Sequence, residues 1–269
     1  MSLGAVLTIG GVSPKELGLG TFRNSQRPIL SSTVDNTVTI PGMHGAYDFG
    51  AMMGPKQFEL ECAFMEKNHI ELQRRVSAFA AFLLDGDGRP RTMDIVFVNS
   101  PDRKYSVRYV GSLNIDRISG LGTFTLPFTA FDPFAYSTYT TIDINVDNTV
   151  ITVDSDLLVD SGYTFTLSGP QSVQIQNIGT LNVEPVIDIT GSFTTLSLTV
   201  GGIEFIYSQP MSGRLVIDFK RKTARIGTQN VLMNSNARFG KIPRGTSNII
   251  VSGIGIDINM AVVFRQKYA

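Results

Sequence analysis

The chain has 269 residues, with 23 basic and 23 acidic side chains, and 42% of its residues are hydrophobic. This apolar content excludes a disordered protein, and the balanced charge gives no net field to attract nucleic acid or an acidic bilayer. Cys62 is the single cysteine, which excludes an internal disulfide and a zinc site built on thiolates. We expect neither a signal peptide nor a membrane span, and hence synthesis in a cytoplasm.

The first distinctive segment is the glycine-rich stretch at residues 41–55. It contains four glycines, three methionines and two aromatic residues but only one charged residue. Glycine lets the backbone approach a partner closely and methionine adapts to apolar surfaces, so the segment is a candidate subunit contact. The alternative is a loop that covers a sheet edge within its own domain. The candidate interface residues are Met43, His44, Tyr47, Met52 and Met53.

An alternating pattern follows directly and predicts a strand over residues 57–64. Its apolar positions are Phe58, Leu60, Cys62 and Phe64. Because side chains alternate across a strand, these residues should face a core while Glu59 and Glu61 face solvent.

One stretch has helical spacing and predicts a helix near residues 69–84. The spacing is carried by Leu72, Val76, Phe79 and Leu83. Asn68 is expected to cap the first turn, Glu71 to complete a capping box, and Gly86 to supply a left-handed residue after the last turn. A single helix packed on strands indicates an α+β domain.

Two further alternating runs, residues 93–97 and 105–109, predict a hairpin with its turn at residues 99–102. The pattern then changes around Pro133, because proline cannot donate to a strand ladder and only short strands follow. We therefore expect an N-terminal domain at residues 1–135 and a C-terminal domain at residues 136–269.

The second half is predicted to be a sandwich of antiparallel strands. The expected strands lie at residues 186–189, 194–200, 203–207, 215–219 and 248–252. Lys220, Arg221 and Lys222, with Arg225 nearby, could bind a phosphate. Their position between two strands instead favours a charged hairpin tip.

No motif in the sequence supports catalysis or a cofactor. His44 and His69 lack partners at the spacing of metal ligands. Residues 85–88 resemble the start of a calcium loop but lack its closing glutamate, so a tight turn after the helix is the simpler interpretation. Glu59 and Glu61 lie on a solvent face and not in a cleft. We expect no enzyme, no cofactor and no metal site.

The order of these features resembles the distal tail protein of long-tailed siphophages, particularly those of Gram-positive hosts. The resemblance covers nearly the whole chain. It is carried by P-G-M-H-G-A-Y-D-F-G at 41–50, D-G-D-G-R-P at 85–90, F-T-A-F-D-P-F-A-Y at 128–136, P-V-I-D-I-T-G-S at 185–192, R-L-V-I-D-F at 214–219 and G-T-S-N-I-I-V-S-G at 245–253.

This resemblance implies a structural component of the virion at the tail tip. An N-terminal split-barrel-like domain would form a hexameric hub ring, single or back to back, and a galectin-like or carbohydrate-module-like β-sandwich would follow it. The implied partners are the tail tube protein, a tail-associated fibre or lysin protein and a receptor-binding protein. DNA would pass through the ring without specific binding, and no membrane or cofactor would be involved.

The alternative function is a carbohydrate-binding adhesin that attaches the tail tip to the host cell wall. Sugar recognition by such sandwiches usually needs an exposed aromatic platform, and the chain has no tryptophan. The remaining aromatic candidates stand mostly in alternating runs, where burial is expected: Tyr163, Phe165, Phe193, Phe205 and Tyr207. A cell-wall hydrolase is a third possibility, but the sequence offers no acid pair for it.

Overall fold

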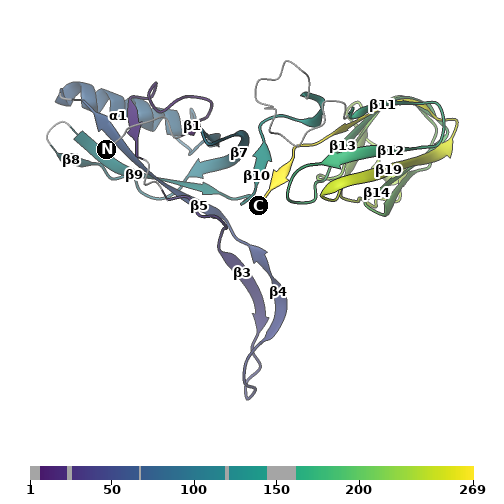
Figure 1. The fold of residues 1–269 in the computed structure, drawn as a ribbon, viewed down its shortest axis with the longest axis horizontal. Coiled ribbons are helices and arrows are strands. Elements are labelled where there is room, and N and C mark those ends of the chain that lie inside the picture. The colour runs from purple at the N-terminus through teal and green to yellow at the C-terminus, as the bar shows by residue number, and fades with distance from the viewer. Residues whose placement is uncertain (1–6, 23–25, 67, 119–120, 144–161) are drawn as a thin grey trace. The chain divides into compact units, whose positions relative to one another are not determined.

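A computed structural model describes residues 7–22, 26–66, 68–118, 121–143 and 162–269 of the chain (Figure 1). The chain divides into two compact units, residues 1–135 with Ala269, and Tyr136–Tyr268. Each unit has a hydrophobic core of its own. The described residues are mainly β with a single α-helix, which confirms the predicted fold class.

The first unit is built on an antiparallel sheet. The strands run in the order β1 (Leu7–Ile9), β6 (Thr92–Phe97), β7 (Ser100–Tyr109), β9 (Leu121–Ala130), β5 (Lys56–Met65) and β2 (Leu19–Thr21), and β8 (Asp116–Ile118) pairs with the start of β9. The long β5–β9 pairing spans all ten residues of each strand, so it forms the backbone of the unit.

The predicted alternation along β5 is confirmed. Its four predicted core residues, Phe58, Leu60, Cys62 and Phe64, are all buried. Glu59 and Glu61 lie on the opposite face, where Glu61 accepts a hydrogen bond of 2.9 Å from the Thr125 hydroxyl. The pattern of apolar residues therefore predicted both the strand and its buried face.

The Cys62 thiol is expected to be inert in the folded protein. The side chain is fully buried, and burial, with a smaller effect of Glu61, raises the pKa of the thiol from 9.0 to about 12. Since the thiolate is the reactive form, a thiol reagent such as dithionitrobenzoate should label Cys62 at neutral pH only after a denaturant is added. Rapid labelling of the native protein would contradict this core position.

The same pKa shift predicts weaker folding in alkali. Below pH 9 the thiol is neutral in both states and contributes its full stability. Above pH 9 only the unfolded chain loses the proton, so the free energy of unfolding should fall as the pH rises toward 12. Denaturant titrations of the wild type and of Cys62→Ala at pH 8 and pH 10.5 measure this loss, which should be smaller in the variant. A part of the loss is shared by both proteins, because burial also raises the pKa of Tyr163 from 10.0 to about 12.

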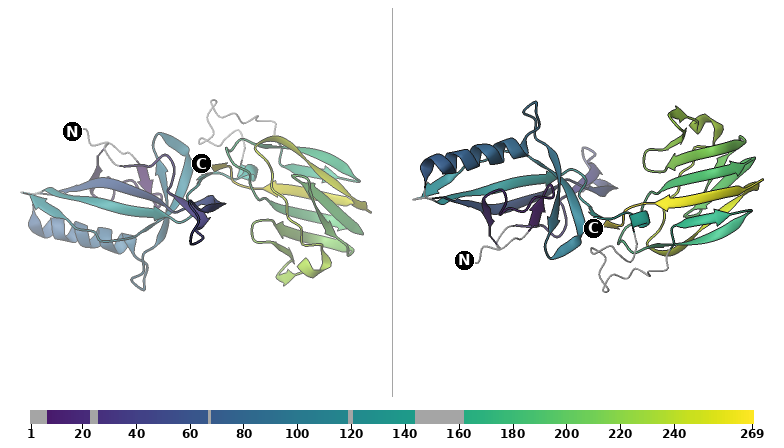
Figure 2. Two further views of the ribbon diagram at one scale, coloured as in Figure 1. Left: turned by 90° about the horizontal axis from the view of Figure 1, so that it is seen from below. Right: turned by 90° about the horizontal axis from the view of Figure 1, so that it is seen from above.

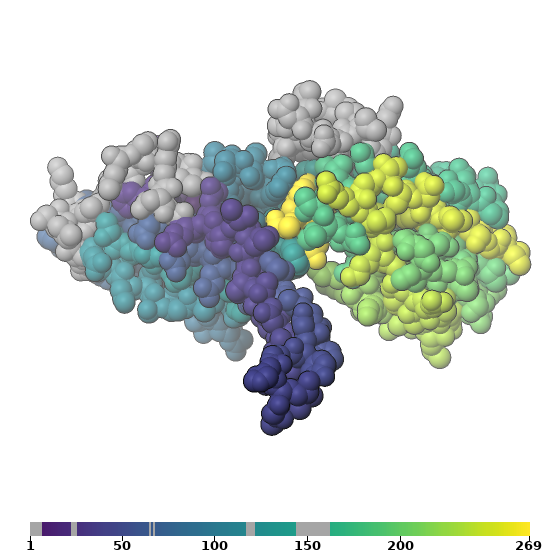
Figure 3. Space-filling view, turned by 60° about the horizontal axis from the view of Figure 1, so that its bottom comes forward, coloured from purple at the N-terminus to yellow at the C-terminus, as the bar shows by residue number. Residues whose placement is uncertain are grey.

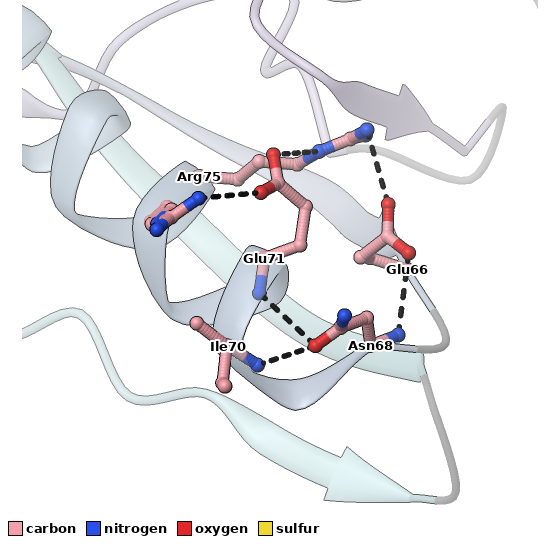
Figure 4. Close-up of polar contacts among 6 residues, drawn as sticks. Glu66, Asn68, Ile70, Glu71 and Arg75 are labelled. Atoms are coloured by element: carbon pink, nitrogen blue, oxygen red, sulfur yellow. Dashed lines mark hydrogen bonds and ion pairs between the residues drawn. The ribbon is translucent and has the colours of Figure 1, made fainter.

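The helix α1 (His69–Leu83) begins where predicted but is capped differently. Asn68 accepts hydrogen bonds from the backbone N–H groups of Ile70 and Glu71, at 2.9 and 3.5 Å (Figure 4). Glu66, and not Glu71, accepts from the Asn68 N–H at 3.2 Å. Glu71 instead faces Arg75, at 3.9 Å. The predicted capping box is therefore only half present.

The end of α1 also differs from the prediction. Leu84 follows the helix in an extended conformation, and Gly86 is not among the residues with positive φ. The chain turns instead through Gly88, at φ 76°, and the Asp85 carboxylate accepts from the N–H groups of Asp87 and Arg89. These bonds support the interpretation of residues 85–88 as a tight turn. Figure 2 shows α1 lying along one face of the sheet.

The predicted hairpin of the first unit is formed by β6 and β7. Its turn lies at Val98 and Asn99, so the prediction of residues 99–102 was wrong by one to three residues. Pro101 belongs to β7, next to an irregularity where the pairing shifts from Val96–Lys104 to Phe97–Ser100. A bulge tolerates proline because it leaves backbone groups unpaired.

The second unit is a two-layer β-sandwich, visible in both views of Figure 2. One sheet has the order β11 (Thr164–Leu167), β20 (Asp257–Val263), β13 (Val186–Phe193), β16 (Met211–Asp218), β17 (Thr223–Ile226) and β18 (Gln229–Asn230). The other has the order β12 (Gln171–Asn177), β19 (Gly245–Ile254), β14 (Thr195–Val200) and β15 (Ile203–Tyr207). The short strands β10 (Ala135–Ser137) and β21 (Lys267–Tyr268) pair with each other, and two 3-10 turns are η1 (Thr141–Asp143) and η2 (Leu232–Asn234).

All five strands predicted for this half are present, several of them longer than expected. Residues 219–222 form the turn between β16 and β17, and Arg225 pairs with Val216, so the hairpin interpretation of the basic run is confirmed. Tyr163, Phe193, Phe205 and Tyr207 are buried, and Phe165 packs against the same core. No helix in the described ranges is long and apolar enough to cross a membrane.

Candidate subunit interface

The glycine-rich segment at residues 41–55 forms the tip and the second strand of an exposed hairpin. The two strands are β3 (Thr33–Val38) and β4 (Tyr47–Met53), and they form a two-stranded sheet of their own. In the space-filling view of Figure 3 the hairpin, in dark blue, stands clear of the rest of the first unit. Residues 33–52 are all exposed, so this segment does not cover a sheet edge of its own domain.

The pairing register gives the hairpin one apolar face. Val34 pairs with Met52 and Val38 pairs with Tyr47, and paired residues project to the same side of a sheet. Val34 and Val38 are four residues apart in one strand, so the two pairs share a face. Between 50% and 63% of each of these four side chains is exposed. Asn36 lies between the two valines on this side of β3, so the face carries one apolar pair at each end, and we call it the apolar face.

The opposite face is polar and acidic. The register places Asp35 opposite Ala51 and Thr37 opposite Asp48. Between these pairs β4 carries one extra residue, and Gly50 there has a φ of 91°, which favours glycine. The Asp48 carboxylate accepts a 2.8 Å hydrogen bond from the Gly50 N–H, which fixes the bulge. We call this side the acidic face.

The five candidate interface residues occupy three places on the hairpin. Tyr47 and Met52 lie on the apolar face. Met53 pairs with Thr33 on the acidic face and is half-buried. Met43 and His44 lie in the exposed tip, where the Met43 N–H donates to the Ile40 carbonyl at 3.1 Å.

The contribution of β3 to this surface was not predicted from the sequence. Val34 and Val38 complete the apolar face, and Phe49, 69% exposed, lies in the bulge. The spacing of four residues between the two valines was the available signal. This spacing could not be interpreted without the partner strand. Two apolar residues in one strand do not reveal which residues of the other strand lie on the same face.

The hairpin is unusual for a part of a folded domain because water reaches both of its faces. An isolated two-stranded hairpin is at best marginally stable, and contiguous apolar surface on a protein commonly marks an interaction site. The arrangement can bind another protein surface. The described residues contain no group of three or more His, Cys, Asp or Glu side chains that could hold a metal ion.

Comparison with known proteins relates the first unit to a family model and the whole chain to a solved fold. Residues 13–130 match the family model of the phage tail protein RIFT-related domain. The crystal structure of Dit (gp 19.1) of phage SPP1, described as a paradigm of the hub adsorption apparatus in phages that infect Gram-positive hosts, has a TM-score of 0.68. Its sequence identity is 16%, over 98% of this chain and 99% of that chain.

A chain of the phage P2 baseplate, solved in its activated conformation with Ca, has 9% identity over 91% of this chain and 90% of its own. Its TM-score of 0.37 is too low to carry an argument. No curated protein matches the sequence significantly. The expected resemblance is thus confirmed by the family model and the Dit fold: residues 13–130 match the phage tail protein RIFT-related domain, and the chain as a whole has the fold of SPP1 Dit.

Proposed function

We propose that this protein is the distal tail hub of a long-tailed phage and that six copies close into a ring through their first units. The observation that carries the proposal is the exposed apolar face of the hairpin in a phage-tail domain. In a ring, the hairpin of each copy would lie on its neighbour, so that Val34, Val38, Tyr47 and Met52 leave water. The interaction is heterologous, and rotational closure prevents an open fibre.

A ring of this kind presents two different ends, which suits a connector. One end would receive the tail tube protein, and the other would hold the fibre or lysin protein and any receptor-binding protein. DNA would pass through the opening without specific contacts. The hub would carry out no chemistry of its own and would be made in the host cytoplasm before incorporation into the virion.

Light scattering coupled to size exclusion tests the oligomeric state directly. The purified protein is expected to elute at six times the mass of the 29.3 kDa chain, or at twelve times if two rings stack. Negative-stain images of the same peak should show closed rings. A protein that stays monomeric at millimolar concentration, alone and with the tail tube protein, would rule out the ring.

The adhesin alternative gains no support from the second unit. Among its described residues, none of the aromatic side chains is exposed enough to form a platform for a sugar ring. Retention of the full-length protein on host cell-wall glycans, with competition by the soluble sugar, would reopen this alternative.

A further inference from the structure

Lys56, the first residue of β5, is a buried cation at the base of the hairpin. Only 2% of the residue is exposed. Its ammonium group donates a 2.9 Å hydrogen bond to the Ile29 carbonyl oxygen and a longer one, of 3.4 Å, to the Tyr105 hydroxyl. The Nζ atom also lies 5.1 Å from the centroid of the Tyr105 ring. No ion pair among the described residues includes Lys56.

A buried ammonium group without a carboxylate depends on its few hydrogen-bond acceptors. The Ile29 carbonyl is the nearer of the two, and it belongs to the backbone of a segment outside the sheet. If this segment moved away, the charge would keep only the distant hydroxyl and the ring face. Leaving a buried charged donor unsatisfied is strongly unfavourable, so the charge favours the position in which Ile29 stays close.

Ile29 belongs to the segment that leads into the hairpin, residues 26–32, which we call the leg. The backbones of Gln26 and Glu59 exchange two hydrogen bonds, of 2.8 and 3.2 Å. The Arg27 guanidinium lies 4.4 Å from the centroid of the Phe97 ring and donates to the Asn99 side chain at 3.1 Å. At its far end the leg is joined to the second strand by a 2.7 Å bond from the Gly54 N–H to the Ser32 carbonyl.

Packing contributes little to the position of the leg. An open hollow of about 560 Å³ is lined by the leg together with Pro55, Gln57 and Glu59. Ile29 is 90% exposed, and the Ser31 hydroxyl is buried without a hydrogen-bond partner in the described structure. The leg is therefore held by a small number of polar contacts. Among those described, the hydrogen bond from Lys56 is the contact made by a buried charged group.

We infer that Lys56 is the positioning residue of the hairpin: its buried ammonium group fixes the leg through the Ile29 carbonyl and thereby sets the direction in which β3 and β4 leave the sheet. Lys56 suits this role because of its place in the chain. It directly follows Gly54 and Pro55, through which the chain leaves β4, and its side chain binds the Ile29 carbonyl in the leg, through which the chain enters β3. The consequence for ring assembly rests on the proposed function, whereas the positioning itself does not.

Hydrogen exchange of the full-length protein tests this inference with Lys56→Met, which keeps the length of the side chain and removes its charge. Amide exchange at Gln26 and at Gly54, whose N–H groups donate to the Glu59 and Ser32 carbonyls, is expected to become about tenfold faster, which corresponds to about 1.4 kcal/mol. Exchange along β9 and in β5 beyond Glu59, whose N–H donates to the leg, should stay unchanged. The melting temperature should hold or rise, because an apolar residue fits a buried site better than a charge.

Lys104→Met is the matched control, since Lys104 is a half-buried lysine of the same unit that pairs with Asp94 at 2.7 Å and does not contact the leg in the bonds described. It should leave exchange in the leg at the wild-type rate. If Lys56→Met does not fold, Lys56→Gln serves as the second variant, with the same expected direction.

Two results would overturn the inference. The first is leg exchange at the wild-type rate in the Lys56 variants. The second is faster exchange spread evenly over β5 and β9 with a lower melting temperature, which would make Lys56 a general core residue. Selective loosening of the leg in a protein that never forms rings would uphold the inference and reject the proposed function, so the two failures are distinguishable.

Discussion

Replacing Met52 by lysine is expected to abolish ring formation while the monomer stays folded. Met52 lies on the apolar face opposite Val34 and is 63% exposed in the single chain. In the proposed ring a lysine there would be buried without a partner, at a cost of about 3 kcal/mol per interface, or roughly a 100-fold loss of affinity at each contact. Light scattering should then give the mass of the monomer, with an unchanged circular dichroism spectrum.

Ala51→Lys is the matched control for this substitution. Ala51 is the adjacent residue, is also exposed, and projects from the acidic face opposite Asp35. A lysine there has a favourable neighbour and should leave the ring intact. If both variants dissociate, or neither does, the apolar face is not the contact surface.

The buried parts of the fold could be predicted from the sequence because burial imposes a period on it. The strand β5 has strict alternation, and α1 has apolar residues at intervals of three and four, so both were predicted with their core faces. The hairpin has no such period, since both of its faces meet water in the single chain.

The details at the ends of elements could not be predicted, because several side chains compete for the same groups. Glu71 is positioned to complete a capping box, but Arg75 lies close enough to attract it, and Glu66 takes its place at the Asn68 N–H. Pro101 suggested a turn, yet a bulge accommodates it inside β7. Such choices depend on the three-dimensional surroundings of each group.

The candidate interface was predicted by its composition but not by its geometry. Met52 and Met53 are adjacent and chemically identical, and the sequence alone gave no reason to separate them. The register places them on opposite faces, and only Met52 joins Tyr47 on the apolar side. Composition therefore drew attention to an exposed segment, while the pairing of β4 with β3 decides which of its residues share the apolar face.

Gly191→Ala is expected to unfold the second unit or to lower its melting temperature by more than about 10 °C. Gly191 lies in β13 at a φ of 137°, a conformation that only glycine adopts readily, and a Cβ atom there would collide with the backbone of Asp257 and Ile258 in β20. Gly213, its direct partner in β16, has a similar φ of 126° but open space around it, so Gly213→Ala should cost only the backbone strain, about 1–3 kcal/mol.

Calorimetry of the full chain measures both variants, and protection of the Cys62 thiol reports whether the first unit stays folded. Equal losses for the two glycines would show that backbone strain, and not the close approach of β13 and β20, requires glycine at position 191.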